Sequence, residues 1–85
     1  MDHLHYPFYA SRGDTIEVTL DKQANVLLLD SINYQHYCQN RQYNYFGGLA
    51  KVSPVHLPVP STGNWHVVID LGEGSGQIKA SARLI

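Results

Sequence analysis

Apolar and polar residues alternate most clearly over residues 15–20. Ile16, Val18 and Leu20 fall on one face of an extended strand, and the polar residues between them fall on the other. Such alternation predicts a half-buried strand. Residues 24–30 instead contain a continuous apolar run, which predicts a central strand covered on both faces. We expect these two strands to form an antiparallel hairpin with its turn at residues 21–23.

A short helix is predicted directly after the central strand, at about residues 32–40. Asp30 or Ser31 can accept a hydrogen bond from a free backbone N–H at the start of this helix. Asn40 can adopt the left-handed conformation that ends a helix. Because the helix is short, only packing against the rest of the domain can hold it.

The rest of the chain predicts five further strands. The first is expected at residues 5–10, and residues 42–46 alternate again before Gly47-Gly48, a pair that breaks a strand or admits a bulge. Residues 55–59 predict an edge strand or an extended segment, because the neighbouring prolines cannot donate to a β-ladder. The last two strands flank a glycine-rich turn, and their expected inward side chains are Trp65, Val67, Ile69 and Leu71, then Ile78, Ala80, Ala82 and Leu84.

These elements together indicate the fold class. Closely spaced strands with turn signals between them are typical of a sandwich or small barrel. A chain of 85 residues is long enough for one domain and too short for two. We therefore predict an all-β, mainly antiparallel fold, a jelly-roll-like β-sandwich or small barrel of about seven strands with one short helix, formed by residues 1–85 as a single domain.

Charge and apolar content narrow the possible partners. The chain has six Lys or Arg against seven Asp or Glu, and its basic residues are scattered. A nucleic-acid partner is not expected, because such binders usually present a concentrated basic face. A membrane partner is not expected either, because the longest aliphatic run, residues 26–29, is far too short to span a bilayer. The single cysteine, Cys38, and the lack of a signal-peptide pattern predict a cytoplasmic protein.

The five histidines form no recognisable catalytic or metal-binding motif. His66 and Asp70 lie on the same face of one predicted strand, but their backbones are roughly 13 Å apart at that spacing, too far for a direct hydrogen bond. A stable metal site usually needs three or four ligands. His3 and His5 supply two, although His3, as the third residue, can bind copper in vitro through an unblocked amino terminus. Without a nucleophile elbow or a P-loop, we expect neither catalysis nor a bound metal or cofactor.

Aromatic residues are the remaining candidates for function. Nine residues are Phe, Trp or Tyr, and six of them are Tyr. One interpretation buries Trp65, Phe8 and Phe46 in the core and places the tyrosines on its rim. The alternative is that the tyrosines form a binding surface, since they combine an apolar ring with a polar tip. The candidate ligand or partner surface consists of Tyr34, Tyr37, Tyr43, Tyr45, His56 and His66.

The segments "GDTIEVTLD", "NVLLLDSINYQHY", "YNYFGG" and "GNWHVVIDLG" resemble a family of short bacterial domains of unknown function. The resemblance covers nearly the whole chain and is most specific between the second and fourth segments. Domains of that family occur alone or beside TIR domains, which act as NAD-consuming effectors or as signalling adaptors. The resemblance implies a domain that senses a ligand or drives assembly in TIR-linked signalling. A looser similarity to jelly-roll-like accessory modules points to the same fold.

Three functions follow as hypotheses. The first is a non-catalytic binding or assembly module, either a homo-oligomer or the partner of a TIR-type signalling protein, because exposed tyrosines and edge segments favour association. The second is a sensor for a small molecule such as a nucleotide or sugar, because tyrosine rings can stack on these ligands. The third is a small hydrolase or metal-binding protein, which requires a carboxylate or a metal beside His56 or His66.

Overall fold

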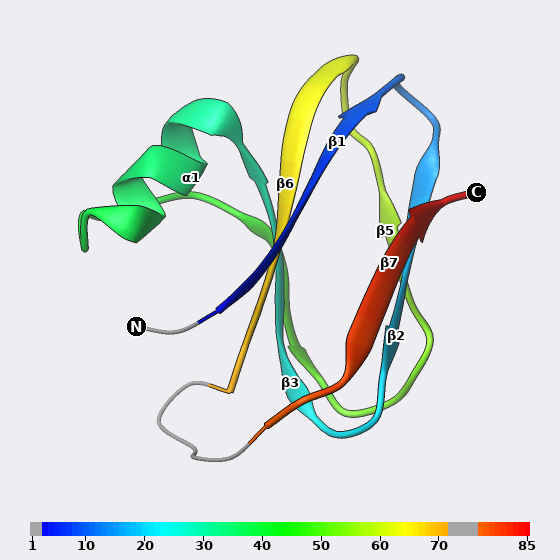
Figure 1. The fold of residues 1–85 in the computed structure, drawn as a ribbon. Coiled ribbons are helices and arrows are strands. Elements are labelled where there is room, and N and C mark those ends of the chain that lie inside the picture. The colour runs from blue at the N-terminus through cyan, green and yellow to red at the C-terminus, as the bar shows by residue number, and fades with distance from the viewer. Residues whose placement is uncertain (1–2, 72–76) are drawn as a thin grey trace.

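A computed structural model of the chain describes residues 3–71 and 77–85 (Figure 1). The described chain contains seven strands and one helix. The glycine-rich turn predicted at residues 73–76 and the first two residues of the copper motif lie outside the described residues. In chain order the elements are β1 (Leu4–Ala10), β2 (Thr15–Leu20), β3 (Ala24–Asp30), α1 (Ser31–Cys38), β4 (Phe46–Ala50), β5 (Val55–Pro58), β6 (Gly63–Asp70) and β7 (Ala80–Leu84).

The strands form two sheets that pack face to face. One sheet has the order β1-β6-β3-β4 and the other has the order β5-β2-β7, and every pairing is antiparallel. Helix α1 lies on the outer face of the four-stranded sheet, so the molecule has three layers (Figure 1). The expected all-β sandwich with one short helix is confirmed. Within the described ranges, the chain has no helix with the length and apolar character needed to cross a bilayer.

The predicted hairpin between β2 and β3 is wrong, because the two strands belong to different sheets. Strand β3 pairs with β4 and β6, whereas β2 pairs with β5 and β7. Residues 21–23 therefore connect the two layers. Asp21 stabilises this connection, since its Oδ1 atom accepts a hydrogen bond from the Lys79 backbone N–H at 3.0 Å. A strand that is apolar on both faces belongs in the middle of a sheet whose two faces are both covered, and this is where β3 lies.

Aliphatic side chains fill the space between the two sheets. The alternation over residues 15–20 is confirmed, because Ile16, Val18 and Leu20 are all buried there. Leu84 is an exception to the predicted inward set, since it is 42% exposed near the end of β7. The buried residues of this inner core are Ala10, Ile16, Val18, Leu20, Ala24, Val26, Leu28, Leu57, Val59, Trp65, Val67 and Ile69.

A second, smaller core lies on the outer face of the four-stranded sheet. Leu27, Leu29 and Val68 alternate with the inner-core residues along β3 and β6, and they pack with Tyr37 of α1. Both faces of β3 are therefore buried, as the continuous apolar run predicted. The helix that covers this outer core, Ser31–Cys38, lies within two residues of the predicted range at both ends.

Strand β4 differs from its prediction. Residues 42–45 precede the strand, and Gly47 and Gly48 lie inside it. The close approach of the Val26 backbone explains why residue 47 is glycine. A Cβ atom on Gly47 would lie 2.3 Å from the Val26 carbonyl oxygen, and the φ angle of Gly47, +102°, is in the left-handed region. Phe46, expected in the core, is instead 54% exposed, although its ring still contacts Trp65 edge-to-face.

Candidate functional site

Helix α1 brings two of the candidate tyrosines onto the sheet. Its first turn is capped by Asp30, whose Oδ1 atom accepts a hydrogen bond from the Asn33 backbone N–H at 2.8 Å. After the last turn, Asn40 adopts a left-handed conformation with φ of 57°. Both end signals appear in the sequence, and both were predicted. The helix fixed in this way packs Tyr34 and Tyr37 against the outer core.

Tyr37 anchors the helix through a buried polar contact. Its hydroxyl donates to Oδ2 of Asp70, also buried, at 2.8 Å, and the Asn25 side-chain amide donates to Oδ1 of the same carboxylate at 3.0 Å. Burial, followed by the hydrogen bond to Asp70, raises the pKa of Tyr37 far above its usual value. The phenol is therefore protonated at neutral pH and remains a donor. A buried carboxylate is costly unless it accepts hydrogen bonds. Asp70 on β6 accepts one from Asn25 on β3 and one from Tyr37 on α1, so these two bonds tie the three elements together.

The remaining two candidate tyrosines take different positions. Tyr43 is half-buried and packs edge-to-face on Tyr37, with ring centroids 5.2 Å apart. Tyr45 contacts Tyr43 at 5.7 Å but is 49% exposed. The Asn44 backbone N–H donates to the Asn33 side-chain oxygen at 2.8 Å, which ties this segment to the helix. The strand predicted for these tyrosines does not form, so one of them packs beside the helix while the other reaches solvent.

Tyr34 belongs to a stack of rings with two histidines. Its ring centroid lies 4.2 Å from that of His5 and 4.7 Å from that of His66, with ring planes 14° and 5° from parallel. The imidazoles bond to each other: His5 Nε2 and His66 Nδ1 are 2.8 Å apart, so one nitrogen donates and the other accepts. Burial lowers the pKa of both histidines, and for His5 the neighbouring His66 lowers the pKa further. Their neutral forms are therefore favoured.

Ser31 extends this hydrogen-bond chain. Its Oγ atom lies 2.9 Å from His66 Nε2, so the order Ser31, His66, His5 matches the order of a serine nucleophile, its base and an orienting group. Two features differ from such a triad. First, the third group is an imidazole, whereas a carboxylate is needed there to stabilise a protonated base. Second, an oxyanion would need free N–H donors at the helix start, but the Asn33 N–H already donates to the Asp30 carboxylate. The arrangement therefore favours a structural role for the chain of contacts.

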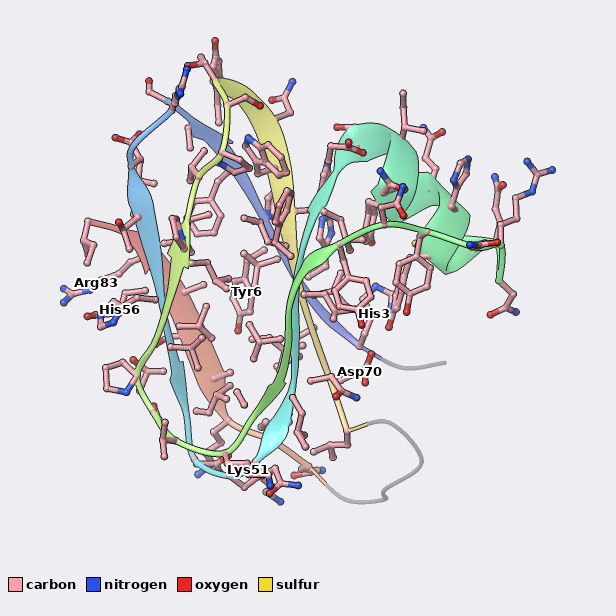
Figure 2. The ribbon with its side chains drawn as sticks, turned by 180° about the vertical axis from the view of Figure 1, so that it is seen from behind. His3, Tyr6, Lys51, His56, Asp70 and Arg83 are labelled. Atoms are coloured by element: carbon pink, nitrogen blue, oxygen red, sulfur yellow. The ribbon has the colours of Figure 1, made fainter. Side chains whose placement is uncertain are left out.

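A pocket of about 430 Å³ opens beside Tyr37 and Tyr43. Figure 2 shows two of its lining residues, His3 and Asp70, on the helix side of the four-stranded sheet. The His3 ring packs edge-to-face on Tyr37 at 5.1 Å, and its Nε2 atom lies 3.3 Å from the Tyr34 hydroxyl. The pocket thus combines aromatic walls with a carboxylate, amides and a guanidinium. Its lining residues are His3, Asn25, Tyr37, Cys38, Asn40, Arg41, Tyr43 and Asp70.

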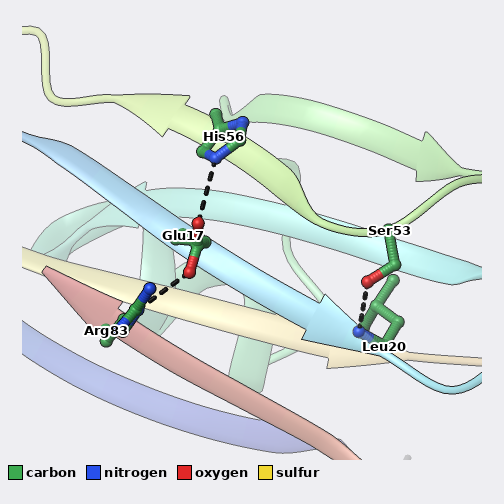
Figure 3. Close-up of polar contacts among 5 residues, drawn as sticks. All are labelled: Glu17, Leu20, Ser53, His56 and Arg83. Carbon is green, nitrogen blue, oxygen red and sulfur yellow. Dashed lines mark hydrogen bonds and ion pairs between the residues drawn. The ribbon is translucent and has the colours of Figure 1, made fainter. Parts of the chain in front are cut away.

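His56 lies apart from the other candidate residues, on β5 of the three-stranded sheet (Figure 2). Its Nε2 atom is 3.2 Å from Glu17 Oε2, and Arg83 Nε donates to Glu17 Oε1 at 2.8 Å (Figure 3). The hydrogen bond from Arg83, then that from His56, lowers the pKa of Glu17. The carboxylate that the hydrolase hypothesis requires is therefore present beside His56. However, Arg83 holds that carboxylate ionised on an open face, which is typical of a surface ion cluster.

Sequence patterns found only part of this site. They identified the tyrosines and His66, but the structure separates Tyr37 and Tyr43, which line the pocket, from Tyr34 and His66, which form the stack. Asn25 and Asp70 were missed as pocket residues. Each is polar at the end of an apolar strand, and the register of β3 with β6 places them opposite each other. That signal becomes readable only when the strand pairing is known.

Among the described residues, no group of three or more His, Cys, Asp or Glu side chains is placed to hold a metal ion.

Searches of curated proteins and of solved structures found no match to the chain. A family model described as "Domain of unknown function (DUF1883)" matches residues 1–85. The chain therefore belongs to the DUF1883 family of domains of unknown function.

Proposed function

We propose that this domain is a non-catalytic binding module, and that the pocket beside Tyr37 takes a small polar ligand of the nucleotide or sugar class. The observation that carries the proposal is the pocket itself, in which two tyrosine rings stand beside a buried carboxylate. Ligand pockets generally combine apolar walls with a few placed polar groups. The buried Asp70, held by Tyr37 and Asn25, supplies such a group on a rigid sheet.

The ligand class follows from the chemistry of the walls. Tyrosine faces stack on sugar rings and on nucleobases. Carboxylate and amide groups exchange hydrogen bonds with ring hydroxyls or amino groups, and Asp70 and Asn25 supply both types. Arg41 at the same pocket suits a phosphate, because its guanidinium can bind two oxygens at once. A nucleotide would use all three features, whereas a sugar would use the first two.

The test is a titration of the 85-residue chain with nucleoside monophosphates and with monosaccharides, followed by amide chemical shifts and by calorimetry. Saturable binding of one class, with shifts at Tyr37, Tyr43 and Asp70, is expected. Tyr43→Ala should weaken binding by about tenfold or more, because it removes one stacking wall. If nucleotides bind and sugars do not, the result would assign phosphate binding to Arg41.

The matched control is Tyr9→Ala. Tyr9 is an exposed tyrosine opposite Asn64, at the end of the sheet remote from the Asn25–Asp70 pair. Its removal should leave affinity unchanged. A folded Tyr43→Ala variant with wild-type affinity, or a chain that binds neither class at millimolar concentration, would contradict the proposal.

A second candidate function is assembly, favoured by the exposed apolar side chains around β4. In this version the domain is a cytoplasmic oligomerisation module, and its self-association brings TIR-type effector partners together in bacterial signalling. The resemblance of the sequence to domains found beside TIR domains supports this context, and four exposed apolar side chains between residues 45 and 52 support association. Sedimentation velocity at micromolar concentration tests it, since a strictly monomeric chain would leave it without a basis.

A further inference from the structure

Strand β4 differs from the other three edge strands of the sandwich. A sheet edge offers unpaired backbone N–H and C=O groups, and proteins commonly block it with proline or with charged side chains. Strand β1 contains Pro7, β5 contains Pro58, and β7 contains Arg83. Strand β4, with the sequence FGGLA, contains neither proline nor charge, and no described strand pairs with its outer edge. It is therefore the edge that is best able to accept another strand.

Exposed apolar side chains gather along the same segment. Half of the large exposed hydrophobic side chains of the described chain lie between residues 45 and 52. We name this group the β4 edge patch. Grouped apolar exposure of this kind marks interaction surfaces more often than isolated exposed residues do. The β4 edge patch consists of Tyr45, Phe46, Leu49 and Val52.

The backbone of β4 is also accessible. Gly47 and Gly48 have no side chains to cover their peptide groups, and a Cβ atom added to Gly48 would have no neighbour within 4 Å. The space over the face to which such a side chain would point is therefore open. Glycine at such positions permits another backbone to approach closely.

We propose that β4 is the interface with a second copy of this chain, in which two β4 strands pair antiparallel about a two-fold axis. The inference rests on the assembly role proposed above and adds the surface that carries it. The pairing joins two four-stranded sheets into one continuous sheet. With the axis at Gly47, Tyr45 lies opposite Leu49 of the partner subunit on one face of the joined sheet, so exposed apolar side chains of the patch meet each other.

Charge explains why a second copy fits this edge. Residues 43–50 carry no charge, so antiparallel self-pairing brings no like charges together. Lys51 follows the strand, at the lower edge of Figure 2. In the proposed register it lies opposite Tyr43 of the partner subunit, which separates the two lysines by roughly 25 Å at the usual rise per residue. Parallel pairing would instead place these lysines side by side.

The test compares two charge substitutions by sedimentation velocity over a range of concentrations. Wild type should be a dimer at micromolar concentration. Leu49→Lys should raise the dimer dissociation constant by about tenfold or more, because lysine on an edge strand opposes pairing. The control is Leu84→Lys, which places the same charge on an exposed leucine of β7 in the other sheet and should leave the dimer intact. Circular dichroism and thermal unfolding check that both variants fold.

Each outcome decides between the two levels of the proposal. A wild-type chain that is monomeric throughout overturns both the assembly role and the β4 interface. A dimer that Leu49→Lys leaves intact, or that Leu84→Lys disrupts equally, overturns the β4 interface alone. If Leu49→Lys dissociates the dimer and Leu84→Lys does not, the result supports the β4 interface. The monomeric Leu49→Lys variant should still bind any ligand of the pocket beside Tyr37, so the two proposed functions are tested separately.

Discussion

The inner face of the four-stranded sheet is covered by a second sheet, whereas its outer face is covered by an eight-residue helix. The same strands, β3 and β6, supply both faces through alternate residues. The buried side chains of the inner face are aliphatic apart from Trp65, and Tyr6 and Phe8 pack beside them. The outer face adds tyrosine rings, three histidines and the Asp70 carboxylate to a few aliphatic residues.

This difference shows how a thin layer is stabilised. A second sheet buries enough apolar area to hold by the hydrophobic effect. A short helix buries less, so specific polar and aromatic contacts supplement its packing. Those contacts hold α1 in place but do not fill the space beside it, and a pocket remains next to Tyr37. The layer that packs less completely is therefore the layer that contains the proposed ligand pocket.

The largest expected effect is a loss of inner-core packing. Leu28 is fully buried between the sheets, and Leu28→Ala should lower the free energy of unfolding by about 3 kcal/mol because it leaves a cavity in a closely packed core. Urea denaturation followed by fluorescence measures this loss. Leu29→Ala, the next residue, lies under the helix and should cost less, because the thin layer can relax into the space. Equal losses would show that the two faces are packed alike.

The outer face should depend strongly on one hydroxyl group. Tyr37→Phe keeps the ring but removes the donor to Asp70, so the free energy of unfolding should fall by about 1.5 kcal/mol. Tyr9→Phe removes an exposed hydroxyl and is the control, with no change expected. If both variants have the same urea midpoint as the wild type, the Tyr37–Asp70 bond does not stabilise the helix layer.

Acidification should weaken the outer face selectively. The pKa values of folded His5 and His66 lie below their ordinary value, so the unfolded chain binds more protons as the pH falls. The stability that these histidines contribute is thus complete above about pH 6.5 and is lost as the pH drops through their lowered folded values. Two protonated imidazoles would also present donors to each other across their 2.8 Å contact.

The urea midpoint measured from neutral to acidic pH tests this expectation. His66→Gln should flatten the pH dependence between neutral pH and about pH 5, because it removes one member of the stacked pair. A His66→Gln variant with the wild-type slope would show that the pair is not the titrating group.

The smallest effect is expected on the opposite surface of the molecule. Glu17→Gln removes the charge shared by His56 and Arg83, but these contacts lie on an exposed face where water and salt screen them. The urea midpoint should therefore match that of the wild type within error, in low and in moderate salt. A clear loss would mean that the outer surface of the three-stranded sheet stabilises the fold as the Tyr37–Asp70 contact does.

Local patterns predicted the strands well but placed some of them wrongly relative to one another. The alternation of β2 and the continuous apolar run of β3 depend on side-chain burial alone, and both interpretations are confirmed. The hairpin between them failed because a short connection can either turn within a sheet or cross between sheets. The glycine pair predicted a strand end or a bulge, whereas both glycines lie inside β4 and Gly47 marks a close approach to the Val26 carbonyl of the neighbouring strand.

The sequence by itself determined most of the strands, the two ends of the helix to within two residues, and that tyrosines concentrate in one segment. These properties follow from periodicity, capping and composition, which act within a few residues. Tertiary structure alone decided that Tyr37 meets Asp70 across 33 positions, that Tyr43 lines a pocket while Tyr45 reaches solvent, and that His56 lies on another sheet. Strand order and register set these contacts, and both depend on the packing of the whole domain.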